Sequence, residues 1–319
     1  MRILIAGGFG FLGGRLAVHL AKSSHEIVLG SSKSRCIPAW LPQARVAHLV
    51  WDDRLSLEQS CLGVDCVIQA AGMNAQECAA DPVEALSFNG LATARLVSAA
   101  CRARVKKFIY ISTAHVYDSQ LAGKITEENC PNNLHAYATS HLAGEQTVLS
   151  ASHRGEIQGI VVRLSNAFGE PTHKEVNCWM LLVNDLCRQA VEKQKLVLRT
   201  SGIQYRDFVS LSWVCEVLEN IALSNFVTVN SNIFNIGAGD SKPIIEMAKL
   251  IQLRCKQVLG FEPTLHQPAD CVTEQPKVLN YRIDKLTKFG FKTNEINVTS
   301  EIDNLLRYCN NNFSLKLSL

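Results

Sequence analysis

The sequence lacks the features that mark several classes of protein. No apolar run approaches the roughly 20 residues of a membrane-spanning helix, so we expect no membrane partner. A net charge of only +3, without a block of like charge, argues against nucleic acid as a partner. The 12 cysteines include no Cys-x-x-Cys pair, which argues against a metal site and favours reduced thiols in a cytoplasmic protein.

The remaining composition is that of a globular protein with a large core. The chain has 319 residues, enough for about two domains, and is 47% hydrophobic and 19% charged. The apolar residues near the N-terminus alternate with glycines, so we interpret this stretch as part of the fold rather than as a signal peptide.

The first 35 residues predict a strand, a glycine turn, a helix and a second strand. Residues 2–6 are an apolar strand, and Gly7, Gly10 and Gly13 interrupt the chain before apolar residues recur at helical spacing. A second apolar run covers residues 26–29. Glycines in this context allow a tight turn, close backbone approach to a pyrophosphate and close packing of helix on strand. The stretch therefore predicts a dinucleotide-binding unit.

Further strands alternate with helices down the chain. We expect strands at 46–49, 64–69, 106–112 and 157–163, and helices at 55–62, 82–103 and 136–150. This alternation predicts an α/β fold with a doubly wound parallel Rossmann sheet. From about residue 169 strands and helices alternate less regularly. We expect a dinucleotide-binding domain over 1–168, with returns near 203–238, and a smaller, discontinuous substrate lobe from 169–202 and 239–319.

The sequence Gly-Gly-Phe-Gly-Phe-Leu-Gly, with its Gly-x-x-Gly-x-x-Gly spacing, resembles the glycine motif of the extended short-chain dehydrogenase/reductases. This family includes nucleotide-sugar epimerases, dehydratases and ketoreductases. The resemblance implies an NAD-type cofactor and a nucleotide-activated sugar as substrate. It also implies a homodimer formed through two long helices, here 82–103 and 136–150. The cofactor contacts that it implies in the first turn are Gly7, Gly10, Phe11, Leu12 and Gly13.

A second group of residues resembles the family's catalytic signature. Thr113 ends a predicted strand, and Tyr137 precedes His141 by one helical turn, so the last two side chains share a helix face. In the family, the tyrosine exchanges a proton with the sugar while hydride moves to or from the nicotinamide. A lysine, four residues after this tyrosine, lowers the tyrosine pKa and binds the nicotinamide ribose.

His141 stands where that lysine is expected. An unperturbed histidine is only about a quarter cationic at pH 7, and its reach is shorter than that of lysine. Three interpretations stay open: His141 replaces the lysine, another group assists Tyr137, or the site is catalytically degenerate. His115 and His135 lie near enough in sequence to take part.

The choice of cofactor is argued from the end of the second strand, where NAD-preferring members carry an acidic residue. Here the chain offers Ser31, Ser32, Lys33 and Arg35, which suit a 2′-phosphate. We therefore expect NADP, with NAD as the alternative. Small residues after the strand at 64–69 let a ligand approach the backbone. The remaining predicted cofactor contacts are Asp52, Asp53, Ala70, Ala71, Gly72 and Asn89, together with Tyr137 and His141.

Two further stretches of the sequence resemble the family's substrate-binding motifs. Arg163-Leu-Ser-Asn166-Ala-Phe-Gly169 resembles Arg-x-x-Asn-x-x-Gly, whose asparagine contacts substrate. Arg206-Asp-Phe-Val resembles the motif whose arginine holds the diphosphate, a use that suits the guanidinium fork. The resemblance therefore assigns substrate contacts to Thr113, Asn166 and Arg206.

The residues after Thr113 bear on the reaction. The family's 4,6-dehydratases have Asp-Glu there, whereas this chain has Ala114 and His115, which argues against dehydration. We expect an epimerase or a ketoreductase that uses Tyr137 as acid/base. The alternative hypothesis is a catalytically degenerate dinucleotide sensor or scaffold. Which sugar and which nucleotide the chain binds stays open.

Overall fold

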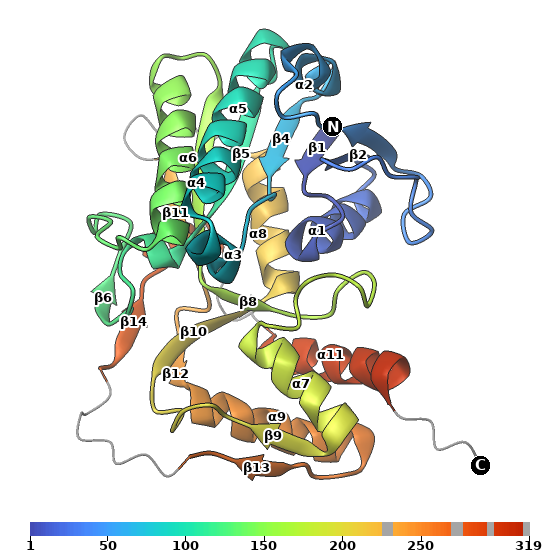
Figure 1. Ribbon diagram of the computed structural model, residues 1–319, viewed down its shortest axis with the longest axis vertical. Coiled ribbons are helices and arrows are strands. Elements are labelled where there is room, and N and C mark those ends of the chain that lie inside the picture. Colours follow the sequence, from blue (N-terminus) through green and yellow to red (C-terminus); the bar gives the residue numbers. More distant parts are fainter. Residues whose placement is uncertain (225–231, 269–276, 292–296, 315–319) are drawn as a thin grey trace. The chain divides into compact units, whose positions relative to one another are not determined.

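The protein is described here by a computed structural model, which covers residues 1–224, 232–268, 277–291 and 297–314. It divides into two compact units (Figure 1). The first consists of Met1–Gln120, Glu127–Leu164 and Cys215–Ile236, and the second of Leu121–Thr126, Ser165–Val214 and Gly237–Leu319. The sequence placed the return to the first unit near 203–238, and in the structure it is Cys215–Ile236.

The first unit is built on a seven-stranded sheet with the order β11-β7-β5-β4-β1-β2-β3. Every strand pair in it is parallel, and β1 lies between β2 and β4, so the chain starts inside the sheet and winds outward in both directions. The predicted doubly wound sheet is therefore confirmed. Its strands are β1 (Arg2–Ala6), β2 (Glu26–Ser31), β3 (Arg45–His48), β4 (Cys66–Gln69), β5 (Lys107–Thr113), β7 (Gln158–Leu164) and β11 (Ile233–Ile236).

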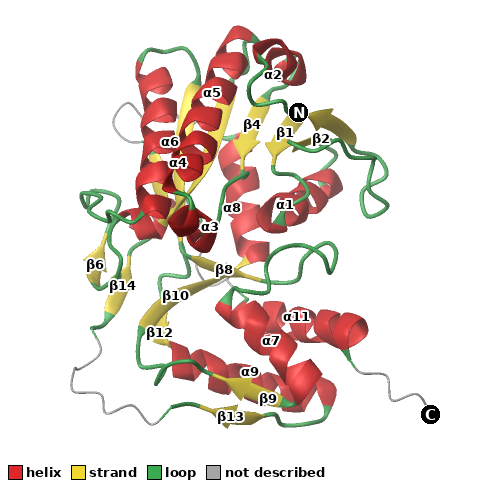
Figure 2. Ribbon diagram, in the orientation of Figure 1, coloured by secondary structure: helices red, strands yellow, loops and turns green. Residues whose placement is uncertain are grey.

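Helices cover both faces of this sheet (Figure 2). Leu4 and Ala6 of β1 belong to the core shared with α2, α5 and α6, whereas Ile3 and Ile5 point to the other face. All four are buried, as expected for a sheet with two covered faces. The helices and turns are α1 (Phe11–Lys22), α2 (Arg54–Cys61), α3 (Ala75–Ala80), α4 (Pro82–Ala85), η1 (Leu86–Leu91), α5 (Ala92–Arg102), η2 (Ala114–Val116), α6 (Ala136–His153) and α8 (Leu211–Leu223).

A buried lysine fastens the end of α8 to the sheet. Lys107, at the start of β5, donates from Nζ to the carbonyl oxygens of Ile221 and Ala222 at 2.8 and 2.7 Å, and also to that of Ser224. The last carbonyl groups of a helix lack intrahelical partners and carry partial negative charge, so a cation stabilises them. Burial lowers the pKa of Lys107.

The single helix predicted over 82–103 is wrong in one respect. The structure divides it into α4, a π-helical segment η1 and α5. Asn89 lies inside the π segment, where its amide contacts the backbone of Met73 and the hydroxyl of Ser140. These contacts are long-range, so the local helical pattern could not predict the wider turn.

The second unit carries three small sheets, of orders β12-β10-β8, β13-β9 and β14-β6. Its core lies among α7, α9 and α11. Its elements are β6 (Gly123–Ile125), β8 (Asn166–Phe168), α7 (Leu182–Lys193), β9 (Lys195–Val197), β10 (Tyr205–Ser210), β12 (Ser241–Pro243), α9 (Ile244–Leu259), β13 (Thr264–His266), β14 (Leu279–Tyr281), α10 (Asp284–Lys288) and α11 (Val298–Phe313). Among the described residues of either unit, no helix is long and apolar enough to cross a membrane.

Candidate active site

The turn between β1 and α1 packs tightly against the loop after β4. Gly7 has a φ of +80°, and its N–H and that of Gly8 donate to the carbonyl oxygen of Gly30 at 3.0 and 3.1 Å. A Cβ on Gly7 would lie 2.7 Å from the backbone nitrogen of Ala71. A Cβ on Gly13 would overlap the carbonyl oxygen of Gly7. Both positions therefore require glycine.

The first turn of α1 offers backbone donors to an anion. Its N-cap, Gly10, has no side chain to accept their hydrogen bonds, and the first turn contains no acidic residue. Phe11 and Leu12 begin the helix. Free N–H groups and the positive end of the helix dipole favour phosphate at such a position. This turn therefore fits the pyrophosphate of a dinucleotide.

The end of β2 presents polar groups, several of them exposed. The predicted residues there are Ser31, Ser32, Lys33 and Arg35. The backbone nitrogen of Lys33 donates to Ser31 Oγ at 3.1 Å, and the Arg35 guanidinium lies 5.5 Å from the centroid of the Phe9 ring. The ammonium group of Lys33 has no partner within the ranges that the structure describes. His48, which the sequence analysis missed, lies with Nε2 3.1 Å from the carbonyl oxygen of Ser32.

The two predicted acidic contacts already have partners. Asp53 is the N-cap of α2, where its Oδ1 accepts from the backbone nitrogens of Leu55 and Ser56 at 2.9 and 3.3 Å. The exposed Asp52 forms an ion pair with Arg95. A contact of either carboxylate with adenine stays a prediction.

The loop after β4, residues 70–72, lies beside Asn89 and His141. A Cβ on Gly72 would lie 3.4 Å from Asn89 Oδ1 and 3.5 Å from His141 Cε1. Asn89 Oδ1 accepts from the backbone nitrogen of Met73 at 2.9 Å, and its Nδ2 donates to Ser140 Oγ at 3.0 Å. The structure thus brings three predicted cofactor contacts from three elements together.

The three predicted catalytic residues also lie together. The Thr113 side chain lies close enough to the Tyr137 hydroxyl to lower its pKa, and the Tyr137 and His141 rings meet edge to face with centroids 4.6 Å apart. His135 is the N-cap of α6, where Nδ1 accepts from the backbone nitrogen of Tyr137 at 3.1 Å. The backbone nitrogen of His115 donates to Thr113 Oγ1 at 3.1 Å. The contacts of both additional histidines thus shape the backbone around the trio.

Burial controls the protonation of this site. It lowers the pKa of His141 to about 4, so the imidazole is uncharged at pH 7. Burial also raises the pKa of Tyr137, an effect that the hydrogen bond with Thr113 partly opposes. Tyr137 therefore keeps its proton at neutral pH.

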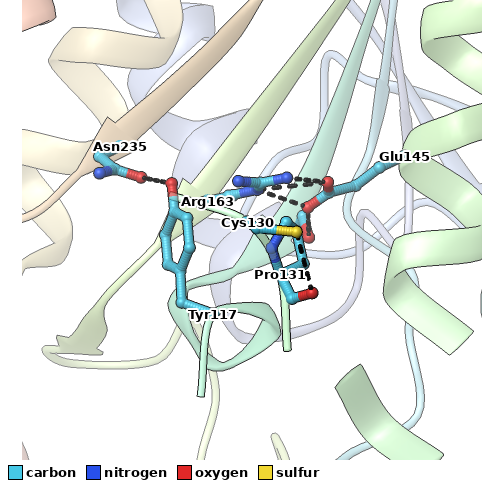
Figure 3. A network of polar contacts seen from close by, with 7 residues as sticks. Tyr117, Cys130, Pro131, Glu145, Arg163 and Asn235 are labelled. Carbon is cyan, nitrogen blue, oxygen red and sulfur yellow. Dashed lines mark hydrogen bonds and ion pairs between the residues drawn. The ribbon is translucent and has the colours of Figure 1, made fainter. Parts of the chain in front are cut away.

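A buried ionic network joins α6 to three strands of the sheet (Figure 3). Glu145 accepts from Ser112 Oγ at 2.5 Å and from Arg163 Nη2 at 2.6 Å, and both charged side chains are almost fully buried. The Arg163 guanidinium lies 4.7 Å from the centroid of the Tyr117 ring, and the Tyr117 hydroxyl donates to Asn235 Oδ1 at 2.7 Å. Ser112 precedes Thr113, so the network fixes the end of β5.

Two further residues of this region were not predicted from the sequence, although both have recognisable signals. Glu145 follows Tyr137 by eight residues and His141 by four, so helical spacing places it on their face. Tyr110 lies three residues before Thr113 on β5, and its hydroxyl is 3.0 Å from His141 Nδ1. An inventory of the polar side chains on the strand and helix that carry the trio could have found both.

The second unit holds the other two predicted substrate contacts. Asn166 of β8 donates from Nδ2 to the backbone oxygen of Asp207 at 3.0 Å. Arg206 lies on the adjacent strand β10, and within the described ranges its guanidinium has no ion-pair partner. Burial lowers the pKa of this guanidinium. An unpaired, partly buried guanidinium suits an anionic ligand.

Comparison with known proteins identifies relatives of this chain. A human protein named dTDP-D-glucose 4,6-dehydratase is 30% identical over 187 residues, which are 57% of this chain and 49% of the relative. An uncharacterized UDP-glucose epimerase of Bacillus subtilis, YtcB, is 23% identical over 95% of this chain and 99% of its own length. The matched segment thus spans about half of the human relative.

Among solved structures, UDP-glucuronic acid 4-epimerase from Bacillus cereus, in complex with UDP-glucuronic acid and NAD, matches with a TM-score of 0.78. The match covers 98% of this chain and 99% of that one at 20% identity, so it supports the fold. A family model described as the NAD dependent epimerase/dehydratase family matches residues 3–237, which include the glycine turn and the three predicted catalytic residues. This chain belongs to the NAD-dependent epimerase/dehydratase family.

Proposed function

We propose that the chain is an NAD(P)-dependent epimerase or ketoreductase that acts on a nucleotide-activated sugar, with Tyr137 as acid/base. One observation carries this proposal: Tyr137, with Thr113 near its hydroxyl, lies beside His141, which packs against Gly72 in the loop that the glycine turn contacts. These contacts connect a group that can transfer a proton to the turn that fits a dinucleotide. The bound nicotinamide would supply or accept the hydride.

The role of Tyr137 is tested by Tyr137→Phe, which removes only the hydroxyl. Turnover of nucleotide sugars should be lost, and binding of the dinucleotide, measured by calorimetry, should remain. Tyr308→Phe in the second unit is the matched control for loss of a tyrosine hydroxyl. Unchanged turnover in Tyr137→Phe would refute the assignment.

We propose NADP as the preferred cofactor, with NAD as the alternative. The exposed Lys33 ammonium, the Ser31 hydroxyl and the nearby Arg35 would hold a 2′-phosphate, and β2 ends without an acidic residue. The first measurement is to denature the purified protein and identify any nucleotide that it releases. Stoichiometric dinucleotide favours a recycled cofactor and an epimerase. An empty protein that binds NADPH more tightly than NADH favours a ketoreductase.

The substrate is proposed to be a nucleoside diphosphate sugar, with Arg206 on its diphosphate and Asn166 as a further contact. Dehydration is not proposed, because Ala114 and His115 replace the acidic pair that the 4,6-dehydratases carry. Assembly as a homodimer and location in the cytoplasm stay predictions of the sequence analysis.

A degenerate dinucleotide sensor is the second candidate, and the uncharged His141 favours it. Such a protein binds cofactor and exchanges no hydride with any nucleotide sugar. A panel of nucleotide sugars and their keto forms, assayed with both dinucleotides, separates it from the enzyme.

A further inference from the structure

The surroundings of the Tyr110 hydroxyl favour one direction for its hydrogen bond with His141. The Tyr110 hydroxyl lies 3.0 Å from His141 Nδ1 and 3.4 Å from the backbone oxygen of Asn89, which already accepts from Thr93 Oγ1 at 2.7 Å. The phenol has one proton, and the imidazole nitrogen is the nearer and less occupied acceptor. Burial raises the pKa of Tyr110, so the hydroxyl keeps its proton, and we take the nearer acceptor, Nδ1, to receive it.

Gly144 makes this contact possible. It lies one turn beyond His141 on α6, and a Cβ there would be 2.5 Å from the Tyr110 hydroxyl oxygen. Any larger residue would therefore move the phenol away from the imidazole. The pair depends on a space that only glycine leaves.

The hydrogen bond fixes the imidazole tautomer. With Nδ1 as acceptor, the neutral ring carries its hydrogen on Nε2. The His141 side chain is about nine-tenths buried, and Nε2 has no hydrogen-bond partner in the part of the chain that the structure describes. The edge that carries Nε2 faces Gly72, at 3.7 Å from where a Cβ would be. A buried donor thus lacks an acceptor beside the loop that is a predicted cofactor contact.

Among the described residues, no cation is found to act on Tyr137 or Tyr110 in place of the lysine that the resemblance implies. The titratable side chains that act on Tyr137 and Tyr110 are Cys78 of α3 and Glu145 of α6, besides the tyrosines themselves. The carboxylate of Glu145 is paired with Arg163 of β7. The phenol of Tyr137 therefore meets a neutral imidazole where the family has an ammonium group.

We propose that Tyr110 is a positioning residue that holds His141 as an uncharged Nε2–H donor to the bound dinucleotide, and that Tyr137 therefore acts as proton donor in the reduction of a keto sugar. The proposal rests on the proposed function of this site. Reduced nicotinamide dinucleotide, when bound, would supply a hydride to the carbonyl carbon, and the C=O π electron pair would move to the oxygen. That oxygen takes the proton of Tyr137, which solvent later replaces. Oxidation of a hydroxyl needs the tyrosinate as base, so it is slow at neutral pH.

The tautomer is tested without turnover. In ¹⁵N-histidine-labelled protein, the His141 resonances, identified by their loss in His141→Gln, should show the neutral Nε2–H tautomer from pH 8 to pH 5.5. Tyr110→Phe should mix the tautomers and weaken NADPH binding several-fold, whereas Tyr308→Phe should change neither. An imidazolium or an Nδ1–H tautomer at pH 7 would overturn the proposal. Gly144→Ala is the second variant, and it should reproduce the effect of Tyr110→Phe.

The direction of proton transfer is tested by pH profiles. For the wild type, kcat/KM for keto-sugar reduction should be flat from pH 6 to pH 8.5, while that for oxidation rises about tenfold per pH unit over this range. An oxidation profile that levels off below pH 8 would refute the claim that Tyr137 stays protonated. If no nucleotide sugar reacts in either direction although the tautomer is as expected, the proposed function fails and the placement of His141 stands.

Discussion

Acid should destabilise this protein through the imidazole of His141. Its pKa is about 4 in the folded chain and about 6.5 in an unfolded one. Between these values the unfolded chain binds more protons, so the free energy of unfolding falls as the pH falls through this window. For one such group the loss between pH 7 and pH 5 is about 2 kcal/mol, a large part of the 5–15 kcal/mol that is typical of a domain.

The variant that isolates this effect is His141→Gln, because the amide keeps a polar group and does not titrate. Urea unfolding of both proteins at pH 7 and pH 5 gives the difference in their free energies of unfolding at each pH. The variant loses packing and the hydrogen bond to Tyr110 at both pH values. Its free energy of unfolding, relative to that of the wild type, should nevertheless rise by about 2 kcal/mol between pH 7 and pH 5. His48→Gln, at an exposed position, is the control. If the difference in free energy of unfolding is the same at pH 7 and pH 5, His141 is not a buried neutral histidine.

Three further substitutions test other parts of the first unit. Arg163→Met leaves the buried carboxylate of Glu145 unpaired and should cost about 3–5 kcal/mol in urea unfolding, and a cost near zero would contradict the buried pair. Gly13→Ala places a Cβ on the carbonyl oxygen of Gly7, so calorimetry should detect no NADPH binding. Asp53→Ala removes the N-cap of α2 and should lower the free energy of unfolding by about 1 kcal/mol, with no change if the cap is not formed.

The sheet could be predicted because its signals are local. An apolar run bounded by glycines defines β1, which the sequence placed at 2–6 and the structure at Arg2–Ala6. The strand expected at 106–112 is Lys107–Thr113, and that at 157–163 is Gln158–Leu164. Such runs report burial directly, and burial on both faces is what a parallel sheet imposes. The π segment around Asn89 depends on distant partners and escaped prediction.

Those residues of the candidate site that belong to sequence motifs could be predicted. The motif positions Thr113, Tyr137 and His141 were found, and the structure brings them together. What the motif could not give is the protonation state, because it arises from burial and from the hydrogen bond of Tyr110, a residue outside every motif. Sequence spacing locates side chains on a common face, but it carries no information on how much water reaches them.

His141, which stands where the family resemblance implies a lysine, acts together with two other residues. An ammonium group on this buried helix face would need compensation, and Glu145, one turn further along α6, is already bound by Arg163. An uncharged imidazole avoids that cost, but it orients a donor only if its tautomer is fixed, which requires the Tyr110 hydroxyl and hence the space at Gly144. Restoring lysine alone would therefore place a buried cation beside a phenol that is itself a donor. An uncharged, oriented imidazole at position 141 thus requires both the Tyr110 hydroxyl and the space that Gly144 leaves. The effect of a substitution at position 141 can therefore be interpreted only together with these two residues.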